Sequence, residues 1–178
     1  MKIGMKAPTL RVPCIFNNTF SFLPFFNFQQ SQFALCCLPD LKETDAWFLE
    51  AQAQEFTQSG SALVILVSND TVLGQDWGRP PQDFGIPFFI DPINRLKKSL
   101  RLAKSLRPNR CETLIFDQDT RLQFRLIHDL SLKGISSVLD IIDSDFEQNS
   151  TEQSQTSNRD SHRALQAASS QIEIKVTA

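Results

Sequence analysis

The chain has 178 residues, of which 41% are hydrophobic and 21% charged, and its formal net charge is −2. This length suits one domain with its own core, and the composition is that of an ordinary globular protein. No apolar run approaches the roughly 20 residues that span a bilayer, which excludes a protein built on membrane-spanning helices. The segment before Pro8 has no apolar core of the kind found in signal peptides, so none is expected.

The first third of the chain alternates between strand and helix patterns. A run of six apolar residues at 33–38 indicates a strand buried on both faces, and apolar residues then recur at helical spacing until Gly60. Asn17, Asn18 and Thr19 form a turn between two short strand patterns. The predicted order is strand 9–12, strand 20–22, strand 33–38 and helix 42–58.

The alternation continues to residue 143. The predicted elements are strand 62–67, a short helical turn that ends at Trp77, strand 86–91, helix 93–106, a hairpin of strands 113–117 and 122–127, and helix 132–143. The order of strands and helices predicts an α/β domain over residues 1–143. Trp47 and Trp77 are predicted to lie in the core, and His128 at the surface.

Residues 144–178 are rich in Ser, Gln, Thr and Asn and poor in large apolar side chains. Such a segment cannot bury enough apolar surface to offset the entropy of the chain, so it is predicted to be a disordered polar tail. Its last stretch, residues 171–176, alternates apolar and polar residues. It fits either a frayed end or a strand that adds to the sheet edge of a partner.

The four cysteines show no CxxC spacing or zinc-type pattern, and two histidines alone cannot build a metal site, so neither a metal nor a cofactor is expected. Cys36 and Cys37 are neighbours on a predicted strand and point to opposite faces, so a bond between them would be strained. Reduced thiols and a cytoplasmic location are the expectation.

Five segments, in this order and spacing, are similar to motifs of one family. They are "KIGMKAPTLRV", "FALCCLPD", "GSALVILVSND", "DWGRPPQDFGIPFFIDPINRLKKSLRL" and "RCETLIFDQDTRLQFRLI". Together they resemble the peroxiredoxin branch of the thioredoxin fold over about residues 3–143. The resemblance implies a three-layer sandwich with a central mixed β-sheet and an N-terminal β-hairpin.

The resemblance also implies an active-site loop of the form Pro-x-x-x-Thr/Ser-x-x-Cys, whose cysteine sits in the first turn of a helix. Pro39 matches the proline, but Glu43 then stands at the hydroxyl position and Ala46 at the cysteine position. Moving the alignment by one residue puts Thr44 at the hydroxyl position and Trp47 at that of the cysteine. Neither alignment supplies a sulfur, so the site is predicted to be degenerate.

Two further features of the sequence fit a degenerate site. The family's arginine falls at Cys111, and Arg110 is one position away, where a strand side chain points to the other face. Three carboxylates, those of Asp40, Glu43 and Asp45, surround the predicted start of the helix. They suit capping and the helix dipole, and they would repel a thiolate.

Cys36 and Cys37 are the remaining thiols near the loop. One of them could act as a redox thiol at the end of the strand, with Cys111 as its partner if the fold brings them within bonding reach. The competing interpretation, which we favour, is that both are small buried apolar side chains.

A basic stretch and a Phe-rich stretch are candidate contact surfaces. On the predicted helix 93–106, Lys97, Arg101 and Lys104 share one face, which suits either a solvated face or docking to an acidic protein, an anionic membrane or nucleic acid. Nucleic acid fits worst, because no aromatic residues alternate with the basic ones. Residues 16–33 include seven Phe, some of which are expected to be exposed. The basic partner-binding candidates are Arg95, Lys97, Lys98, Arg101 and Lys104.

Two functions follow. The favoured one is a peroxiredoxin-like protein without its peroxidatic cysteine, which acts by binding a protein partner or a second copy of itself as a homodimer. The alternative is a divergent thiol-dependent peroxidase or oxidoreductase that uses Cys36 or Cys37.

Overall fold

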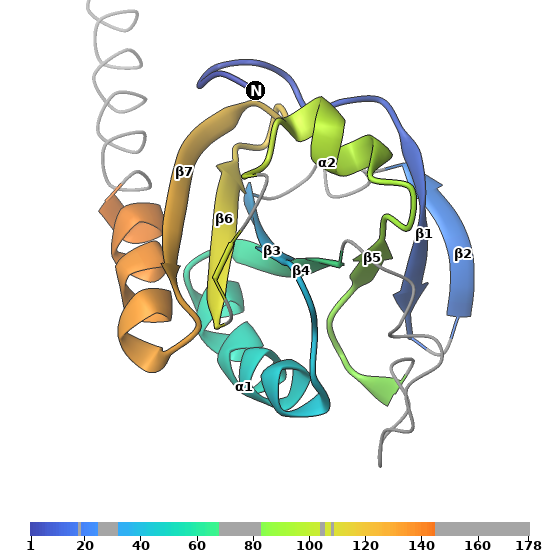
Figure 1. Ribbon diagram of the computed structural model, residues 1–178. Helices are drawn as coiled ribbons and strands as arrows, with labels where there is room; N and C mark the ends of the chain where they lie inside the picture. The colour runs from blue at the N-terminus through green and yellow to red at the C-terminus, as the bar shows by residue number, and fades with distance from the viewer. Residues whose placement is uncertain (18, 25–31, 68–82, 104–105, 108, 145–178) are drawn as a thin grey trace, which may run out of the picture. The chain divides into compact units, whose positions relative to one another are not determined.

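The computed structural model describes residues 1–17, 19–24, 32–67, 83–103, 106–107 and 109–144. Contacts divide the chain into two compact units, Met1–Asp140 and Ile141–Ala178. The first unit holds a seven-stranded sheet with the strand order β2-β1-β5-β4-β3-β6-β7 (Figure 1). The predicted turn at Trp77 and the predicted tail after residue 144 lie outside the described residues.

The strands are β1 (Arg11–Phe16), β2 (Thr19–Pro24), β3 (Gln32–Leu38), β4 (Ser61–Val67), β5 (Phe88–Ile90), β6 (Arg110–Phe116) and β7 (Leu122–Asp129). The helices are α1 (Glu43–Gln58) and α2 (Arg95–Leu100), and residues 132–144 are also helical. β1 and β2 form the predicted N-terminal hairpin, but both are longer than the sequence pattern suggested. Asn17, with a φ of 48°, supplies the tight turn between them.

The predicted central strand is confirmed. β3 pairs in parallel with β4 and antiparallel with β6, so it has a neighbour on each side. All its residues from Phe33 to Leu38 are buried. This double burial explains the continuous apolar run, because neither face of the strand meets water.

The two faces of the sheet carry different helices. Leu35 and Cys37 of β3 pack with Leu96 and Leu100 of α2 in one apolar core, whereas α1 packs against β4. Figure 1 shows α1 and α2 on opposite sides of the sheet. Because side chains alternate along a strand, Cys36 faces away from the α2 side, opposite to Cys37.

The prediction of a helix over 93–106 is wrong in length, because α2 covers only Arg95–Leu100. Asp91 accepts backbone N–H bonds from Arg95 and Lys97, both at 2.8 Å, and so fixes the start of the helix. Arg101 takes a left-handed conformation with a φ of 54°, which ends the helix and turns Leu102 into the core.

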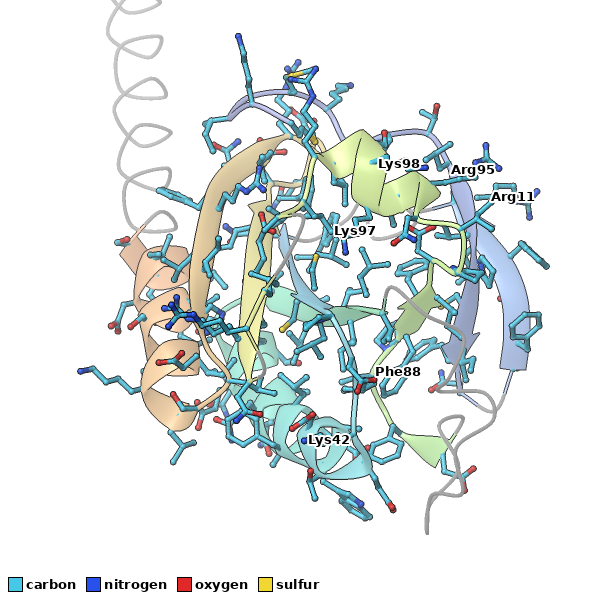
Figure 2. The ribbon with its side chains drawn as sticks, in the orientation of Figure 1. Arg11, Lys42, Phe88, Arg95, Lys97 and Lys98 are labelled. Carbon is cyan, nitrogen blue, oxygen red and sulfur yellow. The ribbon has the colours of Figure 1, made fainter. Side chains whose placement is uncertain are left out.

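The predicted basic face is therefore not continuous on one helix. Arg101 lies beyond the helix end and Lys104 lies outside the described residues. Lys97 is half-buried and reaches from α2 toward the sheet, whereas Lys98 is exposed (Figure 2). Arg95, Lys98 and Arg101 remain as exposed cations on this part of the chain.

Candidate functional site

The first turn of α1 stands where the resemblance places a peroxidatic cysteine. The helix begins at Glu43, directly after the extended residue Lys42. The Asp45 carboxylate accepts the Lys42 backbone N–H at 3.1 Å, which is one half of a capping box. Ala46 follows and is completely buried. A methyl group thus occupies the position at which the resemblance led us to expect a sulfur.

The other predicted residues of this loop surround that turn. Pro39 is half-buried directly after β3, and Thr44 is exposed. Asp40 accepts the Leu41 backbone N–H at 3.0 Å. The free N–H groups at a helix start are what would stabilise a thiolate. Here acidic side chains supply negative charge at this end of the helix, so the local electrostatics disfavour an additional anion.

Trp47 corrects one sequence prediction, because its side chain is 48% exposed rather than buried in the core. Its ring meets Phe84 edge-on at 5.5 Å, and its indole N–H donates to Glu43 Oε1 at 3.4 Å. The buried positions of α1 include Ala46 and Leu49. A residue one place after Ala46 lies about 100° further around the helix and leaves that buried stripe.

Arg110 and Cys111 open β6, at the position expected for the family's arginine. The Arg110 guanidinium pairs with the Asp129 carboxylate at 3.0 Å across the β6–β7 hairpin. Because strand side chains alternate, Arg110 and Cys111 lie on opposite faces. The structure thus places a buried thiol, and not a guanidinium, on the face that Cys36 shares.

That thiol belongs to a buried cluster of four side chains, Cys36, Cys111, Thr113 and His128. Cys111 Sγ lies 3.3 Å from His128 Nε2, and Thr113 Oγ1 lies 2.8 Å from the same nitrogen. Cys36 lies on the same face of the sheet, because its partner in the register of β3 and β6 is Thr113. His128 Nδ1 lies 3.0 Å from the carbonyl oxygen of Asp129. If Nδ1 carries the proton and donates it there, Nε2 is an acceptor that lies within reach of both Thr113 and Cys111.

His128 is therefore not the surface residue that the sequence suggested, since only 7% of it is exposed. Gly134 explains how the chain can cover it. A Cβ added at Gly134 would lie 2.1 Å from the Asp129 carbonyl oxygen and 2.6 Å from His128 Nδ1. Only a residue without a side chain allows the backbone of the helical segment 132–144 to approach so closely.

Burial sets the protonation of these thiols. The pKa of Cys111 is raised, first by the neighbouring Cys36 thiol and then by burial. The pKa of Cys37 is raised by burial and by the nearby Glu112 carboxylate. Burial raises the pKa of Cys14 to about 11. All three are thus neutral thiols near pH 7. The four cysteines are buried and free of disulfide bonds.

On the other face of the sheet, Cys37 lies near a buried carboxylate, that of Glu112. One Glu112 oxygen accepts the Ala103 backbone N–H at 2.7 Å, and the other forms an ion pair with Arg125. Arg125 also donates to the carbonyl oxygen of Arg101 at 2.8 Å. This network stabilises the turn after α2 and places a negative charge near Cys37, which disfavours the thiolate form of Cys37.

Within the described ranges, no three His, Cys, Asp or Glu side chains gather so as to hold a metal ion. In the same ranges, no helix is long and apolar enough to cross a membrane.

Solved structures with a closely similar fold come from peroxiredoxins. The mitochondrial 2-Cys peroxiredoxin of Plasmodium falciparum aligns with a TM-score of 0.66 and 17% identity, over 85% of this chain and 98% of that one. The reduced 2-Cys peroxiredoxin of Plasmodium vivax aligns with a TM-score of 0.67 and 15% identity, over 83% of this chain and 98% of that one. Peroxiredoxin Q of Xanthomonas campestris aligns with a TM-score of 0.61 and 12% identity, over 80% of this chain and 98% of that one.

No protein-family model matches the chain, and neither does any curated protein. At these identities the likeness concerns the fold alone. The chain therefore has the peroxiredoxin-type thioredoxin-like fold that the sequence predicted.

Proposed function

We propose that the protein is a non-catalytic relative of the peroxiredoxins that acts through protein–protein contacts. The observation that carries this proposal is Ala46, a buried methyl group in the first turn of α1. Peroxide reduction in this fold needs a thiolate in that turn, and neither Pro39 nor the residues that follow it provide one. In this proposal, residues 144–178 form a polar tail that is not part of the peroxiredoxin-type domain.

The alternative function, turnover at Cys36 or Cys37, requires a thiol that substrate can reach. Cys36 has no exposed surface and Cys37 is 5% exposed. The raised pKa of Cys37 further lowers the fraction of thiolate at neutral pH. These observations favour the binding function. Four buried, free thiols are also what a protein of the reducing cytoplasm would carry, and we propose that location.

Two surfaces support a binding role. Arg95, Lys98 and Arg101 are exposed, and an acidic partner surface would complement them. On the edge strand β2, Phe20 and Phe22 are each 55% exposed and meet edge-on at 5.9 Å. Large exposed rings of this kind are typical of a contact surface, including one between two copies of a chain.

A stopped-flow assay of the purified, fully reduced protein with hydrogen peroxide tests the proposal. We expect no catalytic consumption of peroxide in the presence of excess dithiol reductant. A kcat/KM of about 10⁴ M⁻¹s⁻¹ or more would be typical of an enzyme and would overturn the proposal. Sedimentation velocity of the wild-type chain and of Phe22→Ser tests self-association, and a dimer that weakens in the variant is expected if β2 forms the contact.

A further inference from the structure

We infer that the side of the sheet covered by α2 is a docking surface for an anionic lipid bilayer. Anionic headgroups pair with exposed cations on this side, and exposed aliphatic side chains beside them enter the boundary between headgroups and acyl chains. The inference goes beyond the protein–protein contacts proposed above and does not depend on them. The exposed cations of this surface are Lys2, Lys6, Arg95, Lys98 and Arg101.

Two segments that are far apart in the sequence cover this side of the sheet. Ala7 lies in the same apolar core as Leu96 and Leu100 of α2, and Met1 packs against that core. The Met1 nitrogen donates to the Leu100 carbonyl oxygen at 2.9 Å. Figure 1 shows the N-terminal segment and α2 at the same end of the sheet. The exposed side chains of residues 2–6 and of α2 therefore belong to one surface.

The two sides of the sheet differ in charge. Residues 1–10 contain two Lys or Arg side chains and residues 92–110 contain seven, and neither range contains Asp or Glu. On the opposite side, α1 has no Lys or Arg, and its carboxylates are those of Glu43, Asp45, Glu50 and Glu55. An anionic bilayer attracts the α2 side and repels the α1 side, so the charge separation orients the protein on the lipid surface.

Few carboxylates near α2 reach solvent. Asp91 accepts the N–H bonds that start the helix and is only 2% exposed, and Glu112, which binds the turn after the helix, has no exposed surface. Asp119, at the tip of the β6–β7 hairpin, is exposed, but exposed Arg121 two residues later offsets its charge. The cations on this side are therefore not neutralised by the carboxylates around them.

Exposed aliphatic side chains among the cations favour a bilayer over an acidic protein as the partner. Ile3, Met5 and Ile93 are 60%, 52% and 65% exposed. A charged protein surface would leave these side chains in contact with water. A bilayer removes them from water while the neighbouring Lys and Arg side chains stay at the headgroups.

Flotation of the full-length protein with unilamellar vesicles tests the inference. We expect binding to phosphatidylcholine vesicles that contain about 30% phosphatidylserine and none to pure phosphatidylcholine vesicles. Raising the salt concentration from about 0.1 M to about 0.5 M should weaken binding at least tenfold, because salt screens the cations. Equal binding to both kinds of vesicle, or binding to immobilised polyglutamate and to no vesicle, would overturn the inference.

A matched pair of double variants tests the charges. Arg95→Gln with Lys98→Gln should weaken vesicle binding about 25-fold, since each cation near an anionic surface contributes about fivefold. Lys42→Gln with Lys133→Gln removes the same charge from exposed positions at the start of α1 and on the helical segment 132–144 (Figure 2 shows Lys42). This control should bind within about twofold of the wild type. Equal losses in the two double variants would contradict the role of the α2 side.

A second matched pair tests the aliphatic contact. Ile93 and Leu132 are both 65% exposed, so neither Ile93→Ser nor Leu132→Ser should affect folding, which circular dichroism checks. Ile93→Ser should weaken vesicle binding at least threefold, whereas Leu132→Ser should leave it unchanged. Unchanged binding of Ile93→Ser would overturn the insertion of this side chain into the bilayer. Peroxide turnover, which is measured separately, would refute the proposed function without changing the outcome of the vesicle test.

Discussion

A reactive thiol site needs an accessible sulfur and surroundings that activate it. The first turn of α1 and the Cys36–Cys111–His128 cluster fail to meet these requirements in different ways. The first turn of α1 is a helix start, where N–H groups can favour a thiolate, but it carries the methyl group of Ala46 and the carboxylates of Glu43 and Asp45. The cluster has sulfur beside an imidazole base at 3.3 Å, but burial removes it from solvent. In neither region do an accessible sulfur and an activating environment coincide.

This separation shows why residue type alone does not predict reactivity. A cysteine near the expected loop, such as Cys37, is neutral because burial and the Glu112 carboxylate raise its pKa. The loop has the expected proline, Pro39, but the position seven residues later holds the methyl group of Ala46, which is not a nucleophile. Activity requires both conditions in one place.

The largest effect is expected from Gly134→Ala, which disrupts the cover of the His128 cluster. The added Cβ would lie 2.1 Å from the Asp129 carbonyl oxygen, so the backbone must move. We expect a loss of about 3 kcal/mol or more in the free energy of unfolding, measured by urea denaturation.

Gly85→Ala is the matched control for Gly134→Ala. Its added Cβ would meet Glu50 Oε1 at 3.5 Å, an ordinary van der Waals contact, so a change below about 1 kcal/mol is expected. Equal effects of the two substitutions would contradict the close approach at His128.

The next largest effect is expected from alkaline pH, which should lower the free energy of unfolding. The pKa of Cys14 rises from 9.0 in its ordinary state to about 11 in the fold because of burial. Between these values the unfolded chain releases the thiol proton and the folded chain keeps it. Stability should therefore fall as pH rises, by at most about 1.4 kcal/mol per pH unit for this group. Urea denaturation at several pH values measures the slope.

Cys14→Ala removes the titrating thiol, so its stability should fall less steeply than that of the wild type over the same alkaline range. A wild-type slope no steeper than that of the variant would show that burial does not keep this thiol neutral.

A smaller effect is expected from Asp45→Ala at the start of α1. The carboxylate accepts the Lys42 backbone N–H at 3.1 Å and complements the helix dipole, so its loss should cost about 1 kcal/mol. Glu55→Ala, at an exposed position near the other end of the helix, should change stability by less than about 0.5 kcal/mol. If Glu55→Ala costs as much as Asp45→Ala, the carboxylates at the helix start have no special role.

Much of the fold could be predicted from the sequence, because apolar runs and helical spacing report burial directly. The length of α2 could not. The pattern of apolar residues continues past Leu100, and only the left-handed conformation of Arg101 ends the helix. A single backbone angle at a non-glycine residue leaves no signal in hydrophobic periodicity.

The position of Ala46 in the first turn of α1 could be predicted from its spacing from Pro39, and the structure places it there, but the His128 cluster could not be predicted. The predicted hairpin strands 113–117 and 122–127 stop short of Cys111 and His128. Pairing Cys111 with His128 required the exact hairpin register, and a bulge between Ile115 and Phe116 shifts it. Such a shift moves side chains to the opposite face.

Ala46→Cys tests the central claim most directly, because it places a sulfur in the first turn of α1 without changing the carboxylates around it. The thiol pKa is measured by the pH dependence of alkylation of the variant relative to the wild type. We expect a pKa at or above the free-cysteine value of about 8.5 and no gain in peroxide consumption. A pKa below about 7, with rapid reaction toward peroxide, would contradict the claim that this helix start no longer supports a thiolate.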